Sequence, residues 1–565
     1  MKWLCILPLL FYAPLLGGFS PAQKGKILYA LHIGETKKAL DAYLEGVDET
    51  KTQDFDLLSE IAKMLIEKGA RSSDPETQLL SIFGASIALD STLLPIFEIG
   101  LNSKQMLTQL AALDGLINLH DDEADLLIHQ ALSSPFLLVR LEAAYKLSAK
   151  NDPNIAGHMQ ALALKVPPPI LPLFPQILVQ LQYPSATRML RQLLTDSDVQ
   201  VRIESIRFIA KEKRDDFLPQ IQRQLTSPNR GEQEACALAL GQLDDHSSLP
   251  SLRQLAKASE IEVRLAALAS LVTLGETETI EGIIEIASQK NLFAAVLLGE
   301  LGNGCGKERI EKIVQCLENL LQETDYSIRL NAMLALLKLK RLPKGAPLSE
   351  FLIRDARDLG MIINRSPGRG LAAASVHPSA TCLTKRHPGM IAQTQLIKEE
   401  ILRETLEQSE EVFLETVATI FQHNETTLIP LSVELLCNHK SERALNFLKK
   451  MEQKAGAPFI RTYCTLALYY AGEEEGYGKK IITWLDQEKS LPPIRFREDK
   501  IASDPDRMTS YTLSPEETSR LMILALELLL KKESEAGVSA LVKMMCHDTS
   551  KNKYAIAGLL IKGVE

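Results

Sequence analysis

Residues 263–275 read Val-Arg-Leu-Ala-Ala-Leu-Ala-Ser-Leu-Val-Thr-Leu-Gly, and this segment carries the clearest indication of secondary structure in the chain. Its leucines and valines recur at helical spacing, which predicts an amphipathic helix with one apolar stripe. The alanines between them leave room for a second helix to approach closely. Glu260 stands four residues before Arg264, so an acid and a base share one face at the helix start. The stretch therefore predicts one half of a closely packed helix pair.

The same pattern returns at a fixed interval along the chain. Arg140, Arg202 and Arg264 each follow a valine in it and stand 62 residues apart, and related sequence occurs at half that interval. A fourth copy, at Arg329, follows a glycine-rich insert that absorbs three extra residues. Five prolines between residues 167 and 175 weaken the pattern there. A register of about 31 residues over about eight units predicts an all-α protein, an α-solenoid of stacked antiparallel helix pairs.

The repeat resembles the short HEAT repeats of phycobilisome lyase-like proteins, whose motif is a turn with Asp, then Val-Arg-x-x-Ala-Ala and a Leu-Gly ending. Residues 263–275 match this motif closely, and the resemblance covers roughly residues 75–340. It implies a HEAT-type solenoid with a surface suited to a protein partner. It decides little about activity, because such repeats serve many tasks. A lyase-like or isomerase-like enzyme, or a chromophore chaperone, remains the alternative.

The recurring arginines have two interpretations. Their shared register predicts structural residues that tie each signature helix to its neighbour or to the preceding turn. The competing interpretation is a basic stripe that binds a ligand. We favour the structural role for all four, which are Arg140, Arg202, Arg264 and Arg329.

The N-terminus predicts export. Lys2 precedes an apolar run from residue 4 to residue 19, as in a secretory signal peptide. Ser20-Pro21-Ala22 has the small residues of a cleavage site, so we expect residues 1–22 to be removed and the mature chain to start at Gln23. An uncleaved anchor is the alternative, and we favour cleavage because the apolar run is short for a membrane span. The protein is then periplasmic or secreted, and any membrane contact belongs to this segment.

Composition sets the expected division of the rest. Residues 23–74 are expected to form a helical cap with tetratricopeptide-like features, residues 75–340 the solenoid, and residues 393–565 a second, degenerate helical array. Between them, residues 341–392 are rich in Pro, Gly and basic residues, which predicts a loop or linker. Either it is a spacer, or it orders on an acidic partner through four basic residues, Arg365, Arg369, Lys385 and Arg386.

No catalytic, cofactor-binding or metal-binding residue is predicted. Residues 302–307 lack the spacing and the Ser or Thr of a phosphate loop, and the acidic residues 121–125 lack the glycine of a calcium loop. His377, Cys382 and His387 lack a fourth zinc ligand. The net charge of -9 argues against a nucleic-acid partner. We therefore expect an exported scaffold or adaptor that binds other proteins through its solenoid surface, and not an enzyme.

Overall fold

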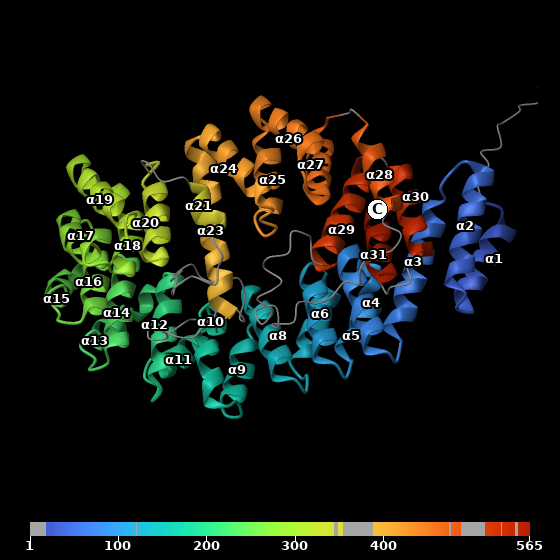
Figure 1. Cartoon of the computed structure of the whole chain (residues 1–565). Helices are drawn as coiled ribbons and strands as arrows, with labels where there is room; N and C mark the ends of the chain where they lie inside the picture. Colours follow the sequence, from blue (N-terminus) through green and yellow to red (C-terminus); the bar gives the residue numbers. More distant parts are fainter. Residues whose placement is uncertain are drawn as a thin grey trace, which may run out of the picture. The chain divides into compact units, whose positions relative to one another are not determined.

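The protein is built from helices. The computed structural model describes residues 19–119, 121–343, 348–353, 388–473, 476–487, 515–532, 534–547 and 552–564, and every regular element in these ranges is a helix (Figure 1). The prediction of an all-α solenoid is confirmed. Within these ranges, no helix combines the length and apolar character that a membrane crossing requires.

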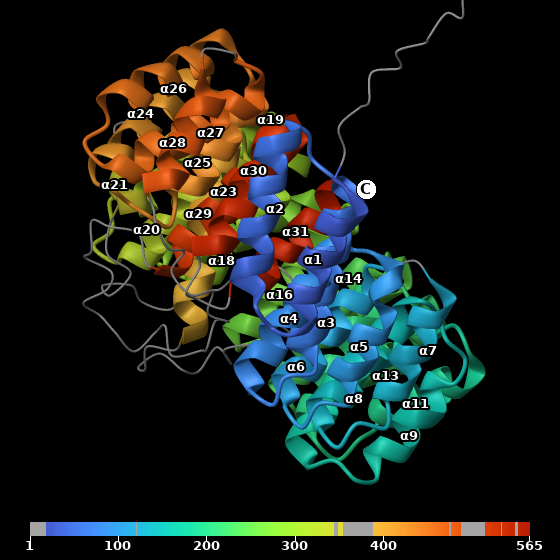
Figure 2. The ribbon, with the colours of Figure 1, turned by 90° about the vertical axis from the view of Figure 1, so that its right-hand side faces the viewer.

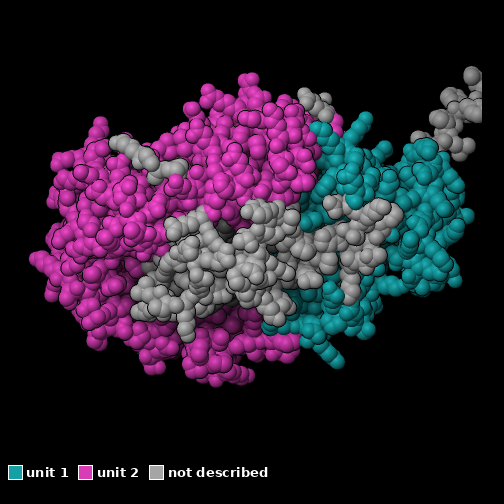
Figure 3. Space-filling view, viewed as in Figure 1, with its two compact units in different colours: residues 1–127, 478–494, 515–565 teal, residues 128–477, 495–514 magenta. Residues whose placement is uncertain are grey.

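The chain forms two compact units, which are coloured separately in Figure 3. Unit 1 contains residues 1–127, 478–494 and 515–565. Unit 2 contains residues 128–477 and 495–514. This division differs from the expected one, because the last helices of the chain belong with the first helices and not with residues 393–477.

Unit 2 begins with a regular series of helix pairs. In chain order its helices are α8 (Leu137–Ala149), α9 (Ile155–Ala163), α10 (Phe174–Leu178), α11 (Pro184–Leu193), α12 (Val199–Lys211), α13 (Leu218–Gln224), α14 (Arg230–Gln242), α15 (Leu249–Leu255), α16 (Ile261–Thr273), α17 (Ile280–Ser288), α18 (Leu292–Leu301), α19 (Lys307–Leu320) and α20 (Tyr326–Lys338). Helices α12, α14, α16, α18 and α20 are the second members of successive pairs, and each packs against the next. We call them the second-helix layer.

The predicted period sets the spacing of this layer. Helices α12, α14, α16 and α18 begin at residues 199, 230, 261 and 292, which are 31 residues apart. A polar side chain at the preceding position often accepts a hydrogen bond from the first turn, as when Asp198 accepts from the backbone N–H of Gln200 at 2.8 Å. Glu260 occupies the same position before α16, but its side chain makes no such bond. The turn chemistry thus fixes where most of these helices start.

The proline-rich unit interrupts the regular pattern. Its second helix is replaced by a 3-10 helix, Pro168–Leu173, followed by the short α10. Proline lacks a backbone N–H and cannot continue an α-helical hydrogen-bond series. Helix α10 still packs against both α8 and α12, so it keeps a second helix's place between its neighbours.

A further group of helices completes unit 2. They are α21 (Leu348–Ile353), α23 (Pro388–Gln408), α24 (Glu410–Gln422), α25 (Ile429–His439), α26 (Glu442–Lys454) and α27 (Pro458–Ala471). The expected loop at 341–392 is therefore partly helical. Helix α21 packs against α24 because its Phe351 and Leu352 are fully buried. Helix α23 begins at Pro388, five residues before the expected start, and packs against α20.

Unit 1 joins the two ends of the chain. Its N-terminal helices are α1 (Pro21–His32), α2 (Thr36–Thr50), α3 (Phe55–Ala70), α4 (Pro75–Ala88), α5 (Leu94–Leu101) and α6 (Met106–Ile117), and α7 (Asp122–Ala131) crosses into unit 2. Its later helices are α28 (Tyr477–Gln487), α29 (Pro515–Lys532), α30 (Ser534–His547) and α31 (Lys553–Val564). Helix α31 packs against α3 and α4, and α30 packs against α2 (Figure 2). Residues 554–561 of α31 are all buried, because α3 and α4 cover that apolar helix.

Candidate protein-binding surface

The second-helix layer presents a mixed surface. The 31-residue register places Ile203, Glu234 and Val296 at equivalent positions of α12, α14 and α18, and all three are half-buried. One turn later, Leu238 of α14 is half-buried and Glu300 of α18 is exposed. The equivalent residue of α16, Leu265, is buried. Apolar and acidic side chains thus lie side by side along this face, which we call the second-helix surface. Protein-binding surfaces commonly combine apolar contact with charged groups in this way.

Arg202, one of the four recurring arginines, donates hydrogen bonds from all three of its side-chain nitrogens. The Nε and Nη2 atoms of Arg202 donate to the two carboxylate oxygens of Glu232 in the next pair, at 3.0 and 2.8 Å. Its Nη1 donates to the backbone carbonyls of Asp196 and Ser197 in the preceding turn. Arg202 therefore joins α12 both to the preceding turn and to α14. A two-pronged pair of this kind fixes geometry as well as charge.

The other three arginines are held differently. The Nε atoms of Arg140, Arg264 and Arg329 are buried, and none has a hydrogen-bond partner within the described ranges. The guanidinium carbon of Arg329 lies 4.9 Å from the ring centre of Phe351, so its cation packs on an aromatic face. The four residues share a register but not a bonding role. The assignment of all four as structural residues stays a prediction.

The difference has a cause in the sequence. Thirty residues after Arg202 stands Glu232, whereas thirty residues after Arg264 stands Ala294. Other pairs of helices are joined at similar spacing by other residues, as in Arg230–Glu260 at 2.7 Å and Lys290–Glu323 at 2.7 Å. A search for opposite charges about 30 residues apart would have found these links.

Two buried glutamates of this region have opposite electrostatics. Burial alone would raise the pKa of Glu232, but hydrogen bonds from Arg202 and Ser227 and the charge of Arg202 outweigh it and lower that pKa. Glu204 is 5% exposed, and burial raises its pKa despite the attraction of Arg207 and a hydrogen bond from Gln200. Compared with an exposed glutamate, Glu232 is thus stabilised in its charged form, and Glu204 is destabilised in its charged form.

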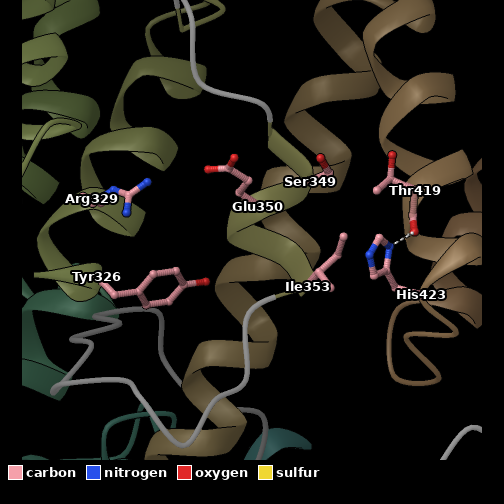
Figure 4. A pocket seen from close by; sticks show the side chains of 7 residues that line it. All are labelled: Tyr326, Arg329, Ser349, Glu350, Ile353, Thr419 and His423. Carbon is pink, nitrogen blue, oxygen red and sulfur yellow. Dashed lines mark hydrogen bonds between the residues drawn. The ribbon is translucent and has the colours of Figure 1, made fainter. Parts of the chain in front are cut away.

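A pocket of about 420 Å³ lies among α20, α21 and α24 (Figure 4). It is lined by residues from all three helices, namely Tyr326, Arg329, Ser349, Glu350, Ile353, Thr419 and His423. The Tyr326 hydroxyl donates to the carbonyl of Phe351, and a ring nitrogen of His423 lies 2.9 Å from the carbonyl oxygen of Thr419. Arg329 and Glu350 add one charge of each sign. The pocket is large enough for a side chain of a bound protein.

Several sequence candidates fall elsewhere. The acidic residues 121–125 open α7, and no group of three metal-binding side chains forms in the part of the chain that the structure describes. Residues 302–304 form a 3-10 turn, and Lys307 starts α19. Outside the described residues lie the basic candidates Arg365, Arg369, Lys385 and Arg386, together with His377, Cys382 and His387.

The described cysteines lie in the core. Each is a free, buried thiol, and the six are Cys236, Cys305, Cys316, Cys437, Cys464 and Cys546. Burial raises the pKa of the Cys546 thiol to about 12, so it resists ionisation at neutral pH. They serve as small apolar residues.

Comparison with solved structures finds other helical proteins. Yeast importin-β (Kap95p) is 11% identical, with 92% of this chain and 80% of that chain covered and a TM-score of 0.38. Kap95 in complex with Nup1 is 14% identical, with 94% and 66% covered and a TM-score of 0.32. These scores are too low to match residues of this chain with residues of those proteins. No curated protein shows significant sequence similarity to the chain.

A family comparison addresses the repeats directly. Residues 218–293 match the family described as HEAT repeats. The matched segment runs from α13 through α17, and α14 and α16 within it keep the 31-residue interval. Residues 218–293 are thus similar to HEAT repeats, and α12 and α18 on either side start at the same interval.

Proposed function

We propose that the protein is an exported scaffold or adaptor that binds other proteins through the second-helix surface. The observation that carries the proposal is the continuity of α12, α14, α16, α18 and α20, each packed on the next. A rigid row of helices holds its exposed side chains at fixed spacing. Such a surface can match an extended partner over several repeats without any catalytic residue.

The side chains on this surface suit a protein partner. Half-buried Ile203, Leu238 and Val296 offer apolar contact, while Arg207 and Glu300 offer charges of both signs. The acidic net charge of -9 disfavours a nucleic-acid partner. The pocket beside Arg329 and Glu350 lies at the end of the same layer and offers a place for one inserted side chain.

Site-specific photo-crosslinking tests the surface. A photoreactive residue is placed at Leu238 of α14 or Val296 of α18, both on the second-helix surface. Matched controls replace the exposed residues Ser251 of α15 and Glu285 of α17, which belong to first helices. We expect one protein to be captured from the native host at both test positions and at neither control. Capture at all four positions, or at none, would contradict the proposal.

Export is tested separately from binding. The full chain is expressed in its host, and the protein is sought in the cytoplasmic, periplasmic and external fractions. We expect it outside the cytoplasm. Recovery only with cytoplasmic markers would reject export but leave the proposed binding surface intact. Absorbance of the purified protein addresses the lyase-like alternative, because a bound bilin would give a visible band.

A further inference from the structure

The first described residues are part of the folded protein. Phe19 is only 6% exposed, and its ring stacks on that of Tyr43 in α2 with 5.0 Å between centroids and 16° between planes. Tyr43 itself is fully buried. Phe19 therefore belongs to the core of unit 1, although it is the last residue of the apolar run that the sequence assigns to a signal peptide.

A glycine in α2 makes room for this ring. A Cβ atom on Gly46 would lie 2.8 and 3.0 Å from the Cζ and Cδ1 atoms of Phe19. Real Cβ atoms essentially never come under 3.0 Å of another atom. Glycine weakens a helix interior, so its presence at this position is explained by the ring that sits against it. The absence of a side chain at Gly46 is needed only in a chain that keeps Phe19.

Ser20 starts the first helix. Its hydroxyl accepts a hydrogen bond from the backbone N–H of Gln23 at 3.3 Å, and the Gln23 side chain accepts from the backbone N–H of Ser20 at 2.8 Å. This reciprocal capping box satisfies backbone donors that the helix start leaves free. The Gln23 amide also donates to Glu49 of α2 at 2.9 Å. Pro21 occupies the first turn, where its missing N–H costs nothing.

We propose that the leader ends at Gly18, and that the mature chain starts at Phe19. A peptidase that accepts small residues would hydrolyse the Gly18–Phe19 bond, and water would supply the carboxylate oxygen of Gly18 and the amino proton of Phe19. Gly18 is the small residue directly before the cut, whereas Leu16 occupies the third position before it, so the assignment rests on the packing of Phe19 and on the helix cap and not on a full small-x-small pattern. The cut expected from sequence, after Ala22, would remove Phe19, the helix cap and the first two residues of α1. This inference rests on the proposed export.

Direct sequencing of the exported protein provides the first test. The full chain is expressed in its host, the exported form is purified, and its N-terminus is determined by Edman degradation and intact mass. We expect the sequence to start at Phe19. A mature chain that starts at Gln23, or one that retains Met1, would overturn the assignment. Protein found only in the cytoplasm would instead contradict export, and the next measurement still decides the structural argument.

Chains that start at Phe19 and at Gln23 are prepared from a cleavable tag and compared by hydrogen exchange. We expect the amides of α1 to exchange at least about tenfold faster in the chain that starts at Gln23. Equal protection in the two chains would overturn the inference. In the chain that starts at Phe19, Ser20→Ala should also speed exchange, whereas Ser20→Thr retains a cap and should not. Gly46→Ala should loosen α1 only in the chain that carries Phe19.

Discussion

Gly84 of α4 and Gly558 of α31 lie backbone against backbone in unit 1. A Cβ on Gly558 would lie 2.9 Å from the carbonyl carbon of Gly84, and one on Gly84 would lie 2.7 Å from the carbonyl carbon of Tyr554. Backbone atoms cannot move aside as a flexible side chain can. These two glycines therefore allow the last helix of the chain to pack on one of the first.

We expect Gly84→Ala and Gly558→Ala each to destabilise unit 1 by about 1–3 kcal/mol, because the added methyl group forces α4 and α31 apart. Hydrogen exchange of α3, α4 and α31 measures the effect locally. Gly25→Ala is the matched control, since Gly25 is an exposed residue within α1 and no atom lies within 4 Å of its added Cβ. The control should gain about 0.5–1 kcal/mol. Equal protection in Gly84→Ala and Gly25→Ala would disprove the close approach.

Arg202 and Arg264 should contribute different amounts to the free energy of unfolding. Arg202→Ala removes a two-pronged bond and leaves the buried Glu232 carboxylate without its cation, so we expect a loss of about 2–3 kcal/mol. Arg264→Ala removes no hydrogen bond at Nε and should cost about 1 kcal/mol or less. Chemical denaturation of both variants measures the difference. A ligand-binding stripe would instead show weaker partner binding in both variants with unchanged unfolding midpoints.

Two conservative substitutions should respond to pH in opposite ways. The lowered pKa of Glu232 means that its charged form stabilises the fold above its ordinary value of 4.5, and this stabilisation is lost as the pH falls through the folded-state pKa. Glu232→Gln should therefore cost about 2 kcal/mol at pH 7 and progressively less below pH 4.5.

The raised pKa of Glu204 gives the opposite dependence of stability on pH. Its contribution is greatest below the ordinary value of 4.5 and is lost as the pH rises through the folded-state pKa. Glu204→Gln should therefore leave stability unchanged at pH 7 or raise it by up to about 1 kcal/mol, and this advantage should shrink on acidification. Denaturation midpoints from pH 3 to pH 8 for the wild type and both variants test the pair. Parallel pH profiles for Glu204→Gln and Glu232→Gln would contradict both assignments.

Deletion of residues 366–386 tests whether the basic segment takes part in partner binding. Residues 366–386 are replaced by a flexible linker, and both the melting temperature and capture of the cross-linked partner are measured. We expect both to be retained, because the helical surface supplies the binding and the segment acts as a spacer. Loss of capture with intact folding would assign recognition to Arg369, Lys385 and Arg386. Loss of folding would show that the segment packs as part of unit 2.

Local chemistry made much of the solenoid predictable. The repeated Val-Arg and alanine pattern predicted helices at a period of 31 residues, and α14, α16 and α18 start at that interval. The binding surface was less predictable. A shared register predicted one role for four arginines, but a side chain's partner depends on the residue that faces it from the next repeat. Glu232 accepts from Arg202, whereas the Nε atom of Arg264 has no hydrogen-bond partner among the described residues.

The amino-acid sequence alone predicted an α-helical solenoid of repeated helix pairs, because helix periodicity and turn residues act over short distances along the chain. Only the tertiary structure decided that α31 packs on α3 and α4, that α21 interrupts the expected linker, and that Phe19 belongs to the core. The physical reason is that an apolar helix can bury its surface against many partners of similar composition. Close shape complementarity, such as that between Gly84 and Gly558, selects one of them, and it arises only when distant segments meet.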